Sequence, residues 1–136
     1  MKNFAFSYIA GIIFFLGIFN WILEVPKYTY FHHALLALYL GSYFAIFGVC
    51  FSLIARRLRF AVALLAAPFL WVPLEYVRSS LSFLALPWGI LAHSQYKNPW
   101  VIQIASLAGV YGVSFLIVLV NSSIAAQPLA SLTVTE

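Results

Sequence analysis

Long apolar runs, separated by short polar or aromatic stretches, dominate this 136-residue sequence. Residues 4–23, 34–55 and 101–126 carry no charge, and residues 60–77 carry only Glu75. About 20 apolar residues in a helix cross the hydrocarbon core of a bilayer, which is about 30 Å thick. The pattern predicts an all-α fold, a multi-pass transmembrane helix bundle with four spanning helices at these positions.

The remaining segments are too short or too polar to span. Residues 81–92 are apolar, but a run of this length is more typical of a re-entrant or interfacial segment. Residues 127–136 form a polar tail with no folded domain of their own. We therefore expect one membrane domain over residues 1–126, followed by this tail.

Composition supports lipid, rather than water, as the surroundings of this chain. Hydrophobic residues make up 65% of it and charged residues 7%, against about 25% charged residues in a typical soluble domain. Three of its seven basic residues, Arg56, Arg57 and Arg59, share one short loop. Basic loops stay in the cytoplasm, which places this loop and the N-terminus inside. Membrane phospholipids are thus the expected partners, and the few basic residues do not indicate nucleic-acid binding.

Small residues spaced four apart occur inside the second apolar run. Gly41 and Ala45 form one such pair, and Gly48 and Ser52 form another. Small residues at this spacing let neighbouring helices approach closely. The pairs predict a helix contact along this face.

Few residues in the chain could carry covalent chemistry, and we assign no catalytic residue, no metal ligand and no cofactor site. The three acids, Glu24, Glu75 and Glu136, are too dispersed to suggest a catalytic dyad. Cys50 lies deep in an apolar run without a nearby base, where a cysteine behaves as a small hydrophobe. Adjacent histidines His32 and His33 lack the further ligands of a metal site.

Trp71, Glu75 and Arg78 are spaced so that they share one face of a helix. A carboxylate at membrane depth is costly unless it is paired, and Arg78 lies one turn away. Two interpretations remain open. The residues form either a polar site pointing into the bundle or a helix-end ion pair that anchors the segment at the interface.

Three sequence motifs, in order, resemble those of bacterial apolipoprotein N-acyltransferases. They are PFLWVPLEYVR at Pro68–Arg78, LPWGILAHSQ at Leu86–Gln95, and GVYGVSFLIVLVN at Gly109–Asn121. Gly11–Trp21 resembles an earlier membrane helix of that family more loosely. His93 and Leu86 depart from the tyrosine and phenylalanine that are usual in the second motif.

The resemblance implies an inner-membrane enzyme that moves a phospholipid acyl chain onto the N-terminal cysteine of a lipoprotein. In that family a nitrilase-like domain with a Glu-Lys-Cys triad carries out the reaction, and none of that domain is recognisable in this sequence. We therefore expect this chain to be inactive alone and to work with such a domain, in the same or another polypeptide, and with a lipoprotein substrate. The candidate residues for a lipid or substrate arm, or for structure, are Trp71, Glu75, Arg78, Pro87, Trp88, Ser94 and Gln95.

Two alternatives remain open. The chain could be a non-enzymatic small helix-bundle protein, such as a transporter or assembly subunit. A polar path lined by several charges within the membrane would support this alternative. The chain could also be the product of a truncated reading frame, which the end at Thr135–Glu136 would fit.

Overall fold

The structure, a computed structural model, describes residues 2–132 of the chain. Those residues contain helices and no strand, which confirms the all-α prediction. They form two compact units, the first through Ser52 and the second from Leu53. In chain order the elements are α1 (Lys2–Ile18), η1 (Asn20–Glu24), α2 (Tyr30–Arg57), α3 (Phe60–Ser80), η2 (Ser82–Leu84), η3 (Leu91–Gln95), α4 (Pro99–Ile102) and α5 (Ala105–Leu132), where η marks a 3₁₀ helix.

Three helices within residues 2–132 are long and apolar enough to cross a membrane, namely α2, α3 from Val62 onward, and α5 through Ala126. Helix α1 is also apolar but has 17 residues, which gives it a length of about 25 Å. Helix length therefore supports three of the four expected spans. That α1 also crosses the bilayer stays a prediction.

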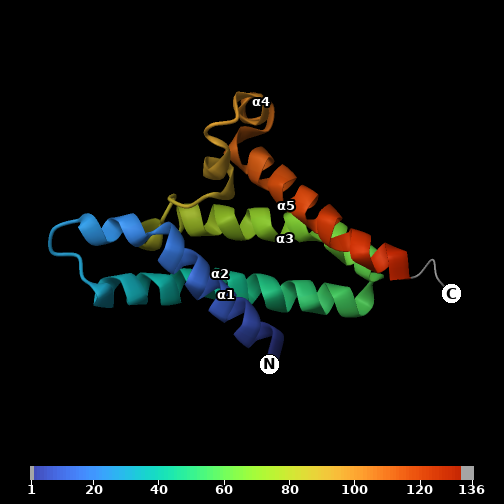
Figure 1. Ribbon diagram of the computed structural model, residues 1–136, viewed down its shortest axis with the longest axis horizontal. Coiled ribbons are helices and arrows are strands. Elements are labelled where there is room, and N and C mark those ends of the chain that lie inside the picture. Colours follow the sequence, from blue (N-terminus) through green and yellow to red (C-terminus); the bar gives the residue numbers. More distant parts are fainter. Residues whose placement is uncertain (1, 133–136) are drawn as a thin grey trace. The chain divides into compact units, whose positions relative to one another are not determined.

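In the first unit, α1 crosses α2 at a glycine contact (Figure 1). A Cβ atom added to Gly11 would lie 2.7 Å from Cβ of Phe44 and 3.0 Å from Cα of Gly41. A Cβ atom added to Gly48 would overlap the side chain of Ser7. The expected close helix contact at Gly41 and Gly48 is thus confirmed, because no larger residue fits without displacing α1.

The expectation of one helix over residues 4–23 is wrong at its C-terminal end. Helix α1 ends at Ile18, and a 3₁₀ turn replaces its continuation. Phe19 is buried, and a ring nitrogen of His33, Nε2, lies 3.1 Å from the carbonyl oxygen of Leu16. Carbonyls in the last turn of a helix lack partners within it, so this contact favours an end here. Apolar composition alone carried no sign of it.

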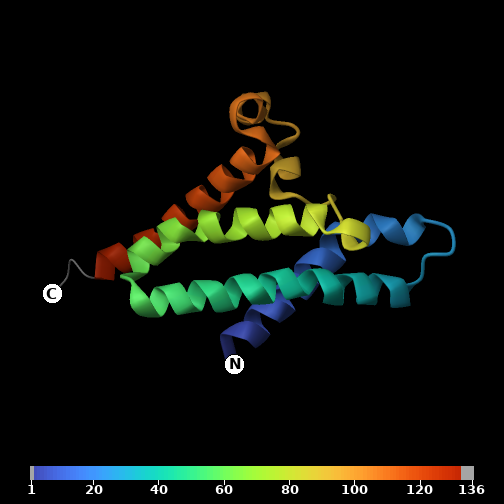
Figure 2. The ribbon, with the colours of Figure 1, turned by 180° about the vertical axis from the view of Figure 1, so that it is seen from behind.

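The second unit is built on α3 and α5, which pack against each other. The rings of Phe69 and Phe115 meet edge-to-face with centroids 4.9 Å apart, and those of Tyr76 and Tyr111 do so at 5.5 Å. Both ribbon views show α5 close to the first half of α3 and farther from its end (Figure 2). The loop between α3 and α4, residues 81–98, is hydrogen-bonded to side chains of both α3 and α5, which position it from two sides.

The fourth predicted span, residues 101–126, is interrupted. Helix α4 is a separate short helix, and α5 contains a break at Gly109, where φ is 66° and ψ is −177°. Glycine adopts this backbone conformation readily because it has no Cβ atom. Helix α5 continues through Leu132 and so includes the first residues of the predicted polar tail. Residues 133–136 lie outside the described part.

Candidate functional site

Glu75 and Arg78 lie in the last two turns of α3 and form a buried pair. Their exposed fractions are 2% and 3%, which is unusual for charged residues. Nη2 of Arg78 lies 4.0 Å from Oε1 of Glu75. Two charges this well buried need further polar partners, and the loop between α3 and α4 supplies them.

The guanidinium group of Arg78 binds the backbone of this loop. Its Nη1 donates to the carbonyl oxygen of Trp88 at 2.7 Å, and its Nη2 donates to that of Gly89 at 3.2 Å. The two carbonyls belong to successive residues, and the backbone turns at the second of them, Gly89, where φ is 70°. A left-handed residue at this point suits glycine. The planar, forked donor of arginine can bridge both oxygens.

The carboxylate of Glu75 holds the same loop two residues further on. Its Oε1 accepts a hydrogen bond from the backbone N–H of Leu91 at 2.8 Å. Its Oε2 is buried and has no hydrogen-bond partner among the described residues. The loop therefore donates a backbone N–H to Glu75 and accepts hydrogen bonds from Arg78 at two backbone carbonyls. These contacts fix the segment from Trp88 to Leu91.

Ser114 of α5 fixes the loop from the other side. Its Oγ accepts a hydrogen bond from the N–H of Ala92 at 3.2 Å, and the residue is fully buried. Ile90, Ala92 and Val113 form a buried apolar cluster next to it. The sequence analysis missed Ser114 as a site residue, although a serine within an apolar span and within the third motif was a usable signal.

The buried pair lies at the end of α3, and the choice between a polar site and a helix-end anchor at the interface stays open. Both side chains are buried and their polar atoms face the backbone of the loop. Hydrogen bonds to a charged partner are stronger than neutral ones. The arrangement can hold a loop in one conformation, and any further functional role of the pair stays a prediction.

The other candidate residues lie apart from the buried pair's hydrogen bonds. Trp71 is half-buried one turn before Glu75, and Pro87 is exposed at the start of the turn. In η3, Nε2 of Gln95 donates to Oγ of Ser94 at 3.1 Å on the exposed side of the loop. The structure thus brings Glu75, Arg78 and the backbone of Trp88 together, while Ser94 and Gln95 form a separate surface contact.

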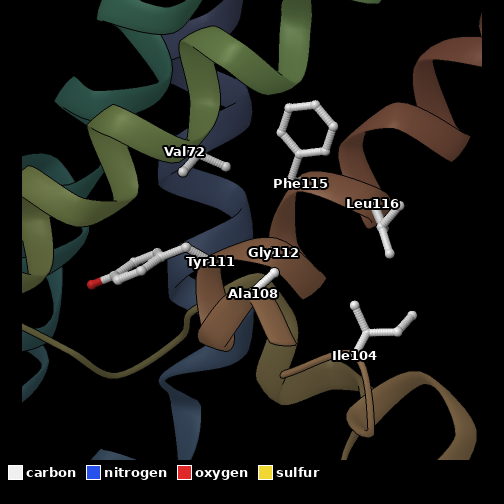
Figure 3. A pocket seen from close by; sticks show the side chains of 7 residues that line it. All are labelled: Val72, Ile104, Ala108, Tyr111, Gly112, Phe115 and Leu116. Atoms are coloured by element: carbon white, nitrogen blue, oxygen red, sulfur yellow. The ribbon is translucent and has the colours of Figure 1, made fainter. Parts of the chain in front are cut away.

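An apolar hollow of about 470 Å³ lies where α5 breaks beside α3. Figure 3 shows the Tyr111 hydroxyl directed away from the other lining side chains. The lining residues are Val72, Ile104, Ala108, Tyr111, Gly112, Phe115 and Leu116. Apolar side chains dominate this lining, so the hollow offers space for apolar atoms and no acid or base for chemistry.

Metal binding finds no support within residues 2–132, where no three His, Cys, Asp or Glu side chains gather into a possible site. Cys50 is a half-buried free cysteine in α2. The chemistry that the described residues do show is hydrogen bonding between a buried charge pair and a loop.

Apolar spanning helices joined by a loop that a buried charge pair holds define this chain as part of a helical membrane protein. Residues 1–123 match the family described as apolipoprotein N-acyltransferase N-terminal domain. The chain belongs to this family and is a membrane-domain part of it. The resemblance noted in the sequence is thereby confirmed, and the comparisons favour it over a non-enzymatic transporter or assembly subunit.

Individual relatives carry the same name. The chain is 36% identical over 126 residues to an apolipoprotein N-acyltransferase of Geobacter metallireducens, covering 88% of this chain and 24% of that protein. It is 35% identical over 116 residues to one of Rhodopirellula baltica, covering 74% and 20%. The chain thus spans about a quarter or less of the length of these relatives. No solved structure matches it.

Proposed function

We propose that this chain is the membrane-embedded part of an enzyme that transfers an acyl chain from a phospholipid to the N-terminal cysteine of a lipoprotein. In this proposal a nitrilase-like domain carries out the covalent chemistry. The chain contributes the helices that hold this domain at the membrane and a loop near the substrates. The family match over residues 1–123 carries the proposal.

The buried pair supports a role for the loop in this function. Three hydrogen bonds, two donated by Arg78 and one accepted by Glu75, fix the segment from Trp88 to Leu91. Half of the Trp88 side chain stays exposed, so the loop can present it to a ligand while its backbone is fixed. An arm held in this way would help to place lipid tails for transfer.

The proposed location is the bacterial inner membrane, with the N-terminus and the loop from Arg56 to Arg59 in the cytoplasm. Arg56 and Arg57 lie in the last turn of α2, and Arg59 precedes α3. All three are exposed at this turn, as the positive-inside rule requires of a cytoplasmic loop. The loop between α3 and α4, one span later, then lies on the outer side.

A segment exchange tests the proposed function. This chain replaces the matching segment of the Geobacter metallireducens relative, and membranes holding the chimera are assayed for N-acylation of a lipoprotein with a free N-terminal cysteine. We expect transfer above that of membranes without enzyme. The control is the unaltered relative at the same membrane abundance.

Two results of this exchange would count against the proposed function. A chimera that inserts into the membrane at normal abundance and retains its helicity, but transfers no acyl chain, would contradict the proposal. A chimera that does not accumulate in membranes would also count against it, because a family segment that forms the same domain should insert in its place.

A further inference from the structure

The segment between α3 and α5 exposes large aromatic side chains. Phe83 is 91% exposed, Trp88 52%, Tyr96 70% and Trp100 80%. Soluble surfaces rarely show so many large apolar groups within one short stretch. Tryptophan and tyrosine prefer the layer between lipid tails and water, where a ring meets apolar atoms at one end and polar atoms at the other.

The position of this segment in the chain favours lipid as its occupant. It begins directly after α3 and ends at the start of α5, and both helices are long and apolar enough to cross a membrane. If both cross it, the segment lies at one surface of the bilayer. Its aromatic surface is then continuous with the lipid-facing sides of these helices.

Charge also suits a lipid surface. Between Glu75 and Glu136 the sequence has no acid. Lys97 is an exposed cation, and its Nζ lies 5.4 Å from the ring centroid of Tyr96. A surface with a cation and no exposed acid is compatible with anionic lipid headgroups.

The buried pair acts on only one part of this aromatic surface. Arg78 binds the carbonyl oxygen of Trp88 directly, whereas Trp100 lies in α4, which packs against α5 and η3. The backbone of Trp88 is therefore bonded directly to Arg78, whereas Trp100 lies in a helix that contacts α5 and η3.

We propose that Phe83, Trp88, Tyr96 and Trp100 form a surface that inserts into the headgroup layer of the bilayer, and that Glu75 and Arg78 set the depth of Trp88 in it. This inference rests on the proposed membrane placement of α3 and α5. It does not require acyl transfer, so either proposal can fail without the other.

Tryptophan fluorescence of the full chain in lipid nanodiscs tests the surface. Single-tryptophan variants keep Trp88 or Trp100 and replace the other three tryptophans by phenylalanine. Phospholipids brominated near the headgroup or near the chain end quench by contact at those depths, and acrylamide quenches from water. We expect both tryptophans to be quenched most by the shallow bromines.

The variant Arg78→Lys tests the buried pair, with Arg59→Lys as a matched control at an exposed arginine. Lysine keeps the charge but cannot bridge two carbonyls with a planar fork. In Arg78→Lys we expect Trp88 to lose its preference for shallow bromines, while Trp100 keeps it. In Arg59→Lys both tryptophans should behave as in the unaltered chain. Glu75→Leu, which removes the acceptor for the N–H of Leu91, serves as a second variant if the helicity of Arg78→Lys falls, and it should shift Trp88 in the same direction.

Three results would overturn the inference. Strong quenching of both tryptophans by acrylamide, with none by brominated lipid, would mean that water covers this surface, and quenching by neither would mean that another protein segment covers it. Unchanged quenching of Trp88 in well-folded Arg78→Lys and Glu75→Leu variants would show that the buried pair does not set its depth.

Discussion

The losses of stability on replacing Glu75 and Arg78 singly should add up to more than the loss on replacing both. Arg78→Met deletes the donor to the Trp88 and Gly89 carbonyls and leaves the carboxylate of Glu75 buried without its counter-ion. Breaking a buried ion pair in this way costs about 3–5 kcal/mol. Both side chains are almost fully buried, so solvent screening reduces this figure little.

Glu75→Gln should be milder. Glutamine keeps an oxygen that can accept from the N–H of Leu91, and the two hydrogen bonds from Arg78 to the loop carbonyls remain. Weakening a hydrogen bond to a charged group costs about 1–3 kcal/mol. In the double variant no charge is left unpaired, so its loss should be smaller than the sum of the single losses by about 0.5–3 kcal/mol.

Equilibrium unfolding in mixed micelles, followed by far-UV circular dichroism, measures the four free energies of this cycle. The exposed residues Glu24 and Arg59 provide a matched cycle with Glu24→Gln and Arg59→Met, for which each change should stay within about 0.5 kcal/mol. If the losses of the two single variants add up to the loss of the double variant within about 0.5 kcal/mol, the coupling is refuted. A loss below about 1 kcal/mol for Arg78→Met would refute the burial argument itself.

Three further substitutions probe the helix contact and the loop. Gly11→Ala should destabilise the chain by about 1–3 kcal/mol through overpacking against α2. At Gly17 an added Cβ atom meets nothing within 4 Å, so Gly17→Ala should stabilise the chain by up to about 1 kcal/mol. The micelle unfolding assay separates the two variants, and equal effects would contradict the close contact of α1 with α2. Gly89→Ala places a Cβ at a positive φ, and the same assay should show a loss of about 1–2 kcal/mol; a neutral change would contradict the turn. Ser114→Ala removes the acceptor for a loop amide and should cost about 1–3 kcal/mol. Ser123→Ala, exposed on the same helix, should change stability by less than about 0.5 kcal/mol, and a matching loss there would count against a specific role for Ser114.

Apolar patterning was sufficient to predict the helical class and the approximate position of α2, α3 and α5. It failed at the end of α1 and at the start of α5. At Ile18 the helix ends where His33, distant in sequence, reaches a carbonyl of its last turn. At Gly109 a single glycine allows a break inside a continuous apolar run. Both depend on contacts or backbone conformations that hydrophobicity does not encode.

The candidate site shows the same division. Helical spacing predicted that Glu75 and Arg78 lie close together, because it depends only on the geometry of one helix. It could not predict that their partners are backbone atoms of Trp88, Gly89 and Leu91, since these contacts require the loop to fold back on α3. Ser94 and Gln95 share a motif with that loop but face its exposed side.

Amide hydrogen exchange at Leu91 tests most directly that the buried pair holds this loop. In the isotope-labelled chain in nanodiscs, the Leu91 N–H bonded to Glu75 should exchange slowly. Glu75→Leu removes the acceptor and should accelerate this exchange by about tenfold or more, whereas Glu75→Gln, which keeps an acceptor oxygen, should accelerate it less. An exchange rate at Leu91 that is the same in the unaltered chain and in Glu75→Leu would contradict the account.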